Sequence, residues 1–170
     1  IVPYGNISLS PATSCIHYGQ SIFEGMKTFK DSEATPLLFR PEMNARRLNR
    51  SARRMAMVEV PEELFMNALH ELIGLDQDWI PTAEGSSLYI RPYLFATDEY
   101  IGVKASDTYK FMILTCPVSD YYSRPVNVLV TDKYIRAFEG GTGTAKVAGN
   151  YAATMLPVKE ARAKGYDQIL

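Results

Sequence analysis

The sequence is poor in cysteine and histidine, with two of each in 170 residues, and it has no excess of either charge. Two cysteines are too few for a disulfide scaffold, and neither histidine has partners at the spacing of a metal site. Lys plus Arg number 18 and Asp plus Glu number 19. A general nucleic-acid binder needs a clustered basic excess, so this balance argues against that class. No apolar run approaches the about 20 residues that span a bilayer, so we expect no membrane partner.

What the sequence does contain is typical of an ordinary soluble globular protein. Hydrophobic residues make up 46% and charged residues 22%, and tyrosine is frequent, with 11 copies. Because there is no signal-like segment and cysteine is rare, the default location is the reducing cytoplasm.

Both ends of the sequence predict a fragment of a longer protein. It begins with Ile1 rather than Met, and its last residues, 167–170, follow Gly165 as a strand follows a helix. We therefore expect the sequence to stop where a new strand begins.

Apolar spacing predicts three helices. The first is amphipathic, over 61–75, with Pro61 in its first turn. Its apolar positions are Leu64, Phe65, Ala68, Leu69, Leu72 and Ile73. A second helix is expected over 42–56, with several arginines outside and a core face made by Met43, Leu48, Ala52 and Met55. A third is expected over 151–164 and ends at Gly165.

Strands are predicted where branched and aromatic residues gather, over 88–95, 109–115 and 126–131. Residues 24–30 and 36–40 predict a hairpin around the polar residues 31–33. The order of strands, helices, strands and then a new strand, loop and helix indicates an α+β fold. The polar segment 117–125, rich in tyrosine and serine, is the best candidate for a domain boundary.

The most informative segment is the loop 140–151, with four glycines in twelve residues. A phosphate-binding P-loop needs Gly before its lysine and Ser or Thr after it, but here these positions hold Ala145 and Val147. The dinucleotide fingerprint does not occur in its proper spacing either. Shielding from water favours the neutral amine of a lysine, which attacks carbonyl carbon, so Lys146 is a candidate nucleophile. An ordinary solvated lysine is the alternative.

The same loop, GGTGTAKVAGNY, closely resembles the catalytic-lysine segment of the branched-chain amino-acid aminotransferases. These are pyridoxal-phosphate (PLP) enzymes of fold type IV. Four further blocks resemble family segments in the right order: HYGQSIFEG at 17–25, FRP at 39–41 with RLNRSA at 47–52, YIRP at 89–92, and GYDQIL at 165–170. Five blocks spread over the sequence make the resemblance specific.

The resemblance implies four residues that contact PLP. Lys146 would bond to the cofactor and then move the proton between the substrate α-carbon and the cofactor. Tyr151 would bind the cofactor's phenolic oxygen, and Gln168 would lie near its ring. Arg47 would bind the phosphate, a task that suits a bidentate guanidinium. From the residues alone, Arg47 is instead part of a solvated basic helix face.

The resemblance also implies a substrate pocket. Its side-chain walls would be Tyr18, Phe23, Tyr89, Val103 and Tyr121. Arg91 would bind the distal carboxylate of glutamate or 2-oxoglutarate, and it shares a strand face with Tyr89 two residues away. From the residues alone, Phe23 and Val103 could be plain core residues. Glu24 fits either a ligand or an ordinary strand residue, and we assign it no role.

The implied protein is a homodimeric transaminase that moves the amino group between leucine, isoleucine or valine and 2-oxoglutarate. Residues 1–118 would form its complete small N-terminal α/β domain, 119–125 an interdomain loop, and 126–170 the incomplete beginning of the large PLP-binding domain. Two alternatives stay open: another fold-type IV enzyme, such as a D-amino-acid aminotransferase or an aminodeoxychorismate lyase, and a non-catalytic fragment.

Overall fold

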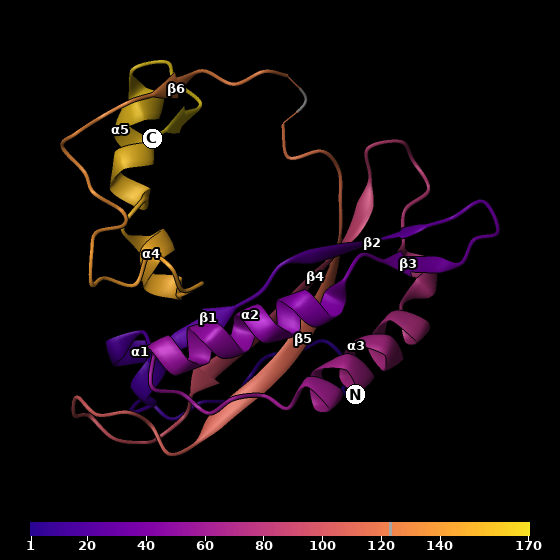
Figure 1. Cartoon of the computed structure of the whole chain (residues 1–170), viewed down its shortest axis with the longest axis horizontal. Coiled ribbons are helices and arrows are strands. Elements are labelled where there is room, and N and C mark those ends of the chain that lie inside the picture. Colours follow the sequence, from indigo (N-terminus) through magenta and orange to yellow (C-terminus); the bar gives the residue numbers. More distant parts are fainter. Residues whose placement is uncertain (123) are drawn as a thin grey trace.

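A computed structural model describes residues 1–122 and 124–170 as a mixed α/β structure (Figure 1). The helices of this part of the chain are α1 (Ser14–Tyr18), α2 (Pro41–Arg54), α3 (Glu62–Leu75), the short 3₁₀-helix η1 (Gln77–Trp79), α4 (Ala148–Ala152) and α5 (Met155–Ala163). The strands are β1 (Ser21–Phe23), β2 (Met26–Lys30), β3 (Pro36–Leu38), β4 (Ser87–Ala96), β5 (Tyr109–Val118), β6 (Val128–Leu129) and β7 (Gln168–Ile169). The predicted hairpin is confirmed, because β2 and β3 pair antiparallel.

The main sheet is built around β4. Strand β5 pairs antiparallel with one edge of β4 along its whole length. The other edge is shared, since β1 pairs with residues 93–95 and β2 with residues 88–90. Between them, the N–H of Glu24 donates to the carbonyl of Pro92 at 2.7 Å. A residue of an antiparallel strand turns its N–H and C=O to the same edge. The missing N–H of Pro92 therefore faces the break between β1 and β2, and β4 keeps its pairing with β5.

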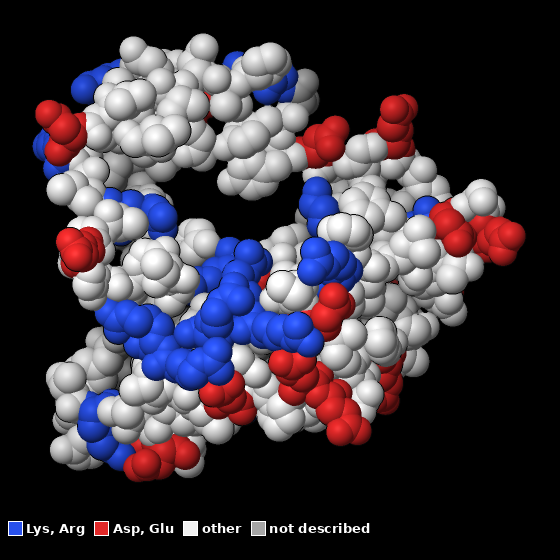
Figure 2. Space-filling view, viewed as in Figure 1, with Lys and Arg blue, Asp and Glu red and all other residues white. Residues whose placement is uncertain are grey.

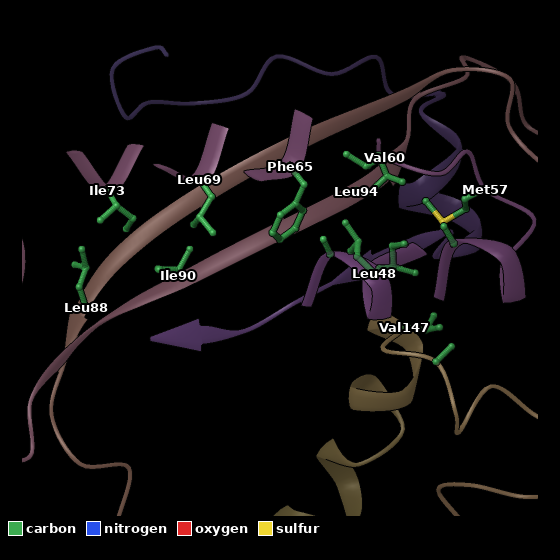
Figure 3. Packing of buried hydrophobic residues seen from close by; sticks show 14 of the residues in the cluster. Leu48, Met57, Val60, Phe65, Leu69, Ile73, Leu88, Ile90, Leu94 and Val147 are labelled. Carbon is green, nitrogen blue, oxygen red and sulfur yellow. The ribbon is translucent and has the colours of Figure 1, made fainter. Parts of the chain in front are cut away.

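Helices α2 and α3 supply the apolar layer that covers this sheet. Figure 3 shows Phe65, Leu69 and Ile73 of α3 facing the β4 side chains of the same buried cluster, Leu88 and Ile90 among them. The predicted helix over 61–75 is confirmed, although Leu64 is 53% exposed on its outer face.

The predicted core face of the second helix is wrong at one position. Leu48 and Ala52 are fully buried, as expected, and Met55 is half-buried against the core, but Met43 is exposed. The buried residues of α2 include Ala45, Leu48 and Ala52, which recur at intervals of three and four. Met43 lies two residues before Ala45, and this offset turns it to another side of the helix.

The predicted single helix over 151–164 is instead two helices, α4 and α5. Pro157 has no N–H to donate to the carbonyl of Ala153, and its ring would clash with that carbonyl in a continuous helix. The chain therefore breaks at Ala153–Thr154 and restarts at Met155. Strand β6 is shorter than the predicted 126–131, and it pairs in parallel with β7, which confirms the strand expected after Gly165.

The segment around Lys146 is held against the sheet by its backbone. The Lys146 carbonyl accepts from the N–H of Phe23 at 3.1 Å, and the Lys146 N–H donates to Ser51 Oγ on α2 at 2.9 Å. The next residue, Val147, forms a bridge with Ile22 of β1 and is buried in the core cluster. The side chain of Lys146 is thus presented from a fixed point between a strand and a helix.

Asn150 closes the glycine-rich loop onto itself. This buried side chain donates from Nδ2 to the carbonyls of Thr142 and Ala145, each at 2.8 Å, and accepts from Thr142 Oγ1 at 2.6 Å. One asparagine therefore fixes both ends of the turn that precedes Lys146.

Shortening a side chain should lower the stability of the protein on the buried face of α3 but not on its exposed face. Replacement of buried Leu69 by Ala removes packing and leaves a cavity, so we expect the free energy of unfolding to fall by about 2–5 kcal/mol. The matched control is Leu64→Ala on the exposed face, for which we expect a change within about 0.5 kcal/mol. Urea denaturation followed by circular dichroism measures both. Equal losses would contradict the assigned core.

Removal of the Asn150 side chain should loosen the loop. The variant Asn150→Ala leaves two carbonyls without their donor, at a cost of about 1–3 kcal/mol in the free energy of unfolding. The control is Thr144→Ala, because Thr144 is exposed in the same loop. The urea midpoint and limited proteolysis of the loop report the difference. If the two variants behave alike, Asn150 does not hold the loop.

Candidate active site

Six of the residues predicted for the site line one open cavity of about 670 Å³ beside β1 and β4. They are Phe23, Tyr89, Arg91, Tyr121, Lys146 and Tyr151. The cavity therefore combines aromatic walls with one amine and one guanidinium, although the six residues come from distant parts of the sequence.

The amine of Lys146 lies at the centre of this arrangement. Its Nζ donates to Tyr151 Oη at 2.7 Å and lies 4.5 Å from the centre of the Phe23 ring. The rings of Phe23 and Tyr151 are themselves 4.9 Å apart. Aromatic faces attract the charged amine and exclude water from one side of it. A phenol at hydrogen-bond distance can exchange a proton with the amine, which is the arrangement that general acid–base chemistry needs.

Tyr89 and Arg91 face the cavity from alternate positions of β4. Arg91 donates to Tyr89 Oη from Nη2 at 2.9 Å and from Nε at 3.2 Å, and its guanidinium carbon lies 4.4 Å above the Phe23 ring. Gly25 makes room for this pair, since a Cβ there would overlap the Tyr89 hydroxyl. Arg91 keeps further N–H donors for an anion, while the rings beside it offer apolar surface.

Arg47 lies at the edge of the site rather than among the residues that line the cavity. It points from α2 to Glu24, with Nε and Nη2 each 2.6 Å from a carboxylate oxygen. This pairing, as the largest cause, raises the pKa of Arg47, and the nearby Tyr151 hydroxyl contributes in the same direction. Figure 2 shows the basic side chains gathered over α2, below the opening between the C-terminal helices and the sheet.

Sequence reasoning missed Glu24 as part of this arrangement. Its side chain is fully buried, and it also accepts from Asn44 Nδ2 at 2.9 Å. The available signal was its position, because an acidic residue between Phe23 and Gly25 in an apolar strand needs a buried partner. The sequence did not show which of the many arginines would supply that partner.

Besides Arg47, three predicted residues do not line the cavity. Tyr18, the last residue of α1, is 41% exposed, and Val103 is 91% exposed in the loop between β4 and β5. Gln168, in β7, donates to Tyr122 Oη at 2.9 Å. Their assignment to the site remains a prediction.

Within residues 1–122 and 124–170, no three His, Cys, Asp or Glu side chains are grouped closely enough to hold a metal ion. In the same ranges, no helix has both the length and the apolar character needed to cross a bilayer. The polar groups that line the cavity include the Lys146 amine, the Arg91 guanidinium and several tyrosine hydroxyls.

Solved structures of known proteins share this fold. The T.th. branched-chain amino acid aminotransferase, complexed with N-(5'-phosphopyridoxyl)-L-glutamate, superposes with a TM-score of 0.80 at 26% identity, over 99% of this chain and 54% of that one. The branched-chain amino acid aminotransferase from Escherichia coli superposes with a TM-score of 0.73 at 27% identity, over 96% of this chain and 52% of that one. These similarities confirm the predicted fold class.

Curated relatives match along the whole chain. Branched-chain-amino-acid transaminase 1 of Bacillus subtilis (strain 168) is 48% identical over 174 residues, which cover 100% of this chain and 49% of that protein. A probable branched-chain-amino-acid aminotransferase of Staphylococcus aureus (strain N315) is 50% identical over 175 residues, covering 100% of this chain and 48% of that protein. The chain thus spans about half the length of these relatives. The model of the family described as amino-transferase class IV matches residues 21–170, and the chain belongs to that family.

Proposed function

We propose that the intact protein is a PLP-dependent aminotransferase that moves the amino group between leucine, isoleucine or valine and 2-oxoglutarate. The observation that carries this proposal is the Lys146 amine, 2.7 Å from Tyr151 Oη in an aromatic cavity that also contains Arg91. The names of the relatives at 48% and 50% identity support the branched-chain substrates. Neither a D-amino-acid aminotransferase nor an aminodeoxychorismate lyase is favoured by these names.

The donor set of this chain fits PLP. An aldehyde needs an amine, a phenolic oxygen needs a hydrogen-bond donor, and a phosphate needs a cation; Lys146, Tyr151 and Arg47 offer these groups. A related structure holds a phosphopyridoxyl-glutamate, which supports the same cofactor here. When bound, PLP acts as the electron sink that makes the substrate α-carbon acidic. We assign Gln168 a place near the cofactor ring on the resemblance alone.

In this proposal, Lys146 Nζ holds the cofactor before reaction and then moves the substrate proton. The fixed backbone of Lys146 keeps the amine within reach of one spot in the cavity, as a general base requires. Tyr151 binds the phenolic oxygen and holds the amine by its hydrogen bond. Phe23 closes one side of the amine against water.

One cavity must accept both an aliphatic side chain and a carboxylate. Phe23, Tyr89 and Tyr121 offer apolar ring surface, which favours the transfer of leucine, isoleucine or valine side chains from water. Arg91, held by the Tyr89 hydroxyl at 2.9 Å, supplies N–H donors for the distal carboxylate of glutamate or 2-oxoglutarate.

We further propose that the protein is a homodimer in which Tyr18 and Val103 complete the cavity of the partner subunit. Both are exposed and lie outside the cavity of their own chain. Their two segments are joined, because Gln20 Oε1 accepts from the N–H of Ser106 at 3.1 Å. They can therefore be presented together, as one surface, to a second copy.

The predicted division of the chain stays a proposal, with a small domain over 1–118, a connecting loop over 119–125 and the start of a large domain over 126–170. The parallel pairing of β6 with β7 around α4 and α5 supports a separate unit after the loop. Residue 123 of that loop lies outside the described residues. Both cysteines are free thiols, which supports a cytoplasmic location.

Replacement of Lys146 by Ala should remove both the cofactor-dependent absorbance and the transamination of leucine by the intact protein. The reason is that no other amine lines this cavity among the residues that the structure describes. Lys159→Ala is the control, since Lys159 is an exposed lysine on α5, and it should keep both signals. If the Lys146→Ala protein retained either signal, Lys146 would not be the cofactor lysine.

Replacement of Arg91 by Ala should affect one substrate class selectively. A charge-assisted hydrogen bond is worth about 1.5–3 kcal/mol, so kcat/KM for 2-oxoglutarate should fall by about 10- to 100-fold. The value for the 2-oxo acid of leucine, which has no distal carboxylate, should change much less. Steady-state kinetics with both acceptors measure the ratio, with Lys110→Ala on the neighbouring strand as control. An unchanged ratio would remove Arg91 from carboxylate binding.

A further inference from the structure

Glu24 is a fully buried carboxylate in the break between β1 and β2. It accepts hydrogen bonds from Arg47 Nε and Nη2, both at 2.6 Å, from Asn44 Nδ2 at 2.9 Å and from the N–H of Gly25 at 3.3 Å. Burial of a charge is costly, and a well-packed apolar residue often serves stability equally well. Stability alone therefore does not account for a buried carboxylate at this position, whereas an effect on its hydrogen-bond partners would.

Its effect on Arg47 is to fix the plane of the guanidinium. A guanidinium has five N–H donors in a rigid fork, and the bidentate contact uses Nε–H and one Nη2–H. The remaining N–H groups point away from Glu24. The Arg47 side chain is 47% exposed while that of Glu24 is 0% exposed, so the free edge of the guanidinium faces the accessible side.

Two other ion pairs of α2 join exposed side chains only. Arg46 contacts Glu62 at 3.3 Å and Arg53 contacts Glu59 at 2.6 Å, and all four of these side chains are about half exposed. Exposed pairs of this type restrain a side chain only weakly. Among these three arginines, only Arg47 is paired with a buried carboxylate.

The same stretch of chain also fixes the lysine. The N–H of Phe23 donates to the carbonyl of Lys146 at 3.1 Å, and the N–H of the next residue, Glu24, donates to Pro92 at 2.7 Å. Two successive residues therefore set the backbone of Lys146 and the guanidinium of Arg47. The anchor points of the two cationic residues are therefore neighbours in the sequence, at the end of β1 and in the break that follows it.

We propose that Glu24 is a positioning residue that holds the free edge of Arg47 towards the phosphate of PLP, at a fixed spacing from Lys146. This inference depends on the proposed function, because it takes PLP as the ligand. The charge of Glu24 and its positioning of Arg47 would affect phosphate binding with opposite signs. Glu24 partly neutralises Arg47, so if charge alone mattered, removing the carboxylate charge would tighten phosphate binding. If position matters, the same change loosens it.

The test is the variant Glu24→Gln in the intact protein, with PLP and with pyridoxal, which has the same ring without the phosphate. Fluorescence titration gives the two dissociation constants. We expect the affinity for PLP to fall by about tenfold or more, because a charge-assisted contact is lost, while that for pyridoxal stays the same. The variant Glu59→Gln, which breaks the exposed pair with Arg53, should change neither affinity.

Two further variants guard against a merely structural effect. In an Arg47→Met background, Glu24→Gln should cause no additional loss specific to PLP. If Glu24→Gln does not fold, Glu24→Asp keeps the charge but shortens its reach, and it should weaken PLP binding more than pyridoxal binding. Equal losses for both ligands, or tighter binding of PLP, would overturn the positioning role. A wild-type protein that binds neither ligand would instead overturn the proposed function.

Discussion

The backbone of Lys146 is held from two sides, by the N–H of Phe23 on β1 and by the Ser51 hydroxyl on α2. These contacts join parts of the chain that are about a hundred residues apart in sequence. They place the lysine amine over the Phe23 ring and beside the Tyr151 hydroxyl. The rest of the site is arranged around that fixed point, since the cavity walls come from β1, on which the lysine segment is anchored, and from β4, which pairs with β1.

The interruption between β1 and β2 is the second constraint. Pro92 has no backbone N–H and so needs no hydrogen-bond acceptor at the interruption, and Gly25 leaves room there for the Tyr89 hydroxyl. The interruption also buries Glu24 against Arg47. This local irregularity in the sheet therefore affects two parts of the site. It accommodates the Tyr89–Arg91 pair on the cavity side, and it holds the guanidinium of Arg47 at the edge of the cavity.

Local sequence patterns predicted much of the fold, but they did not predict the contacts between residues that are far apart in the sequence. The helix over 61–75, the hairpin and the strand over 88–95 follow from apolar periodicity and turn residues. The break before α5 was accessible through Pro157, whose missing N–H interrupts the helix. The Glu24–Arg47 pair was not, because several arginines of one helix were equivalent in sequence. Tyr18 and Val103 carry no local pattern that tells a plain surface residue from one that faces a second subunit.

The most direct test of the central claim asks which lysine carries the cofactor. The intact protein is loaded with PLP, treated with borohydride to make the bond between amine and cofactor permanent, digested, and analysed by mass spectrometry. We expect the pyridoxyl label on the peptide that contains Lys146, and no comparable label on the peptides that contain Lys133, Lys159 or Lys164. A protein without label, or with its label on one of those lysines, would contradict the assignment of this cavity as the PLP site.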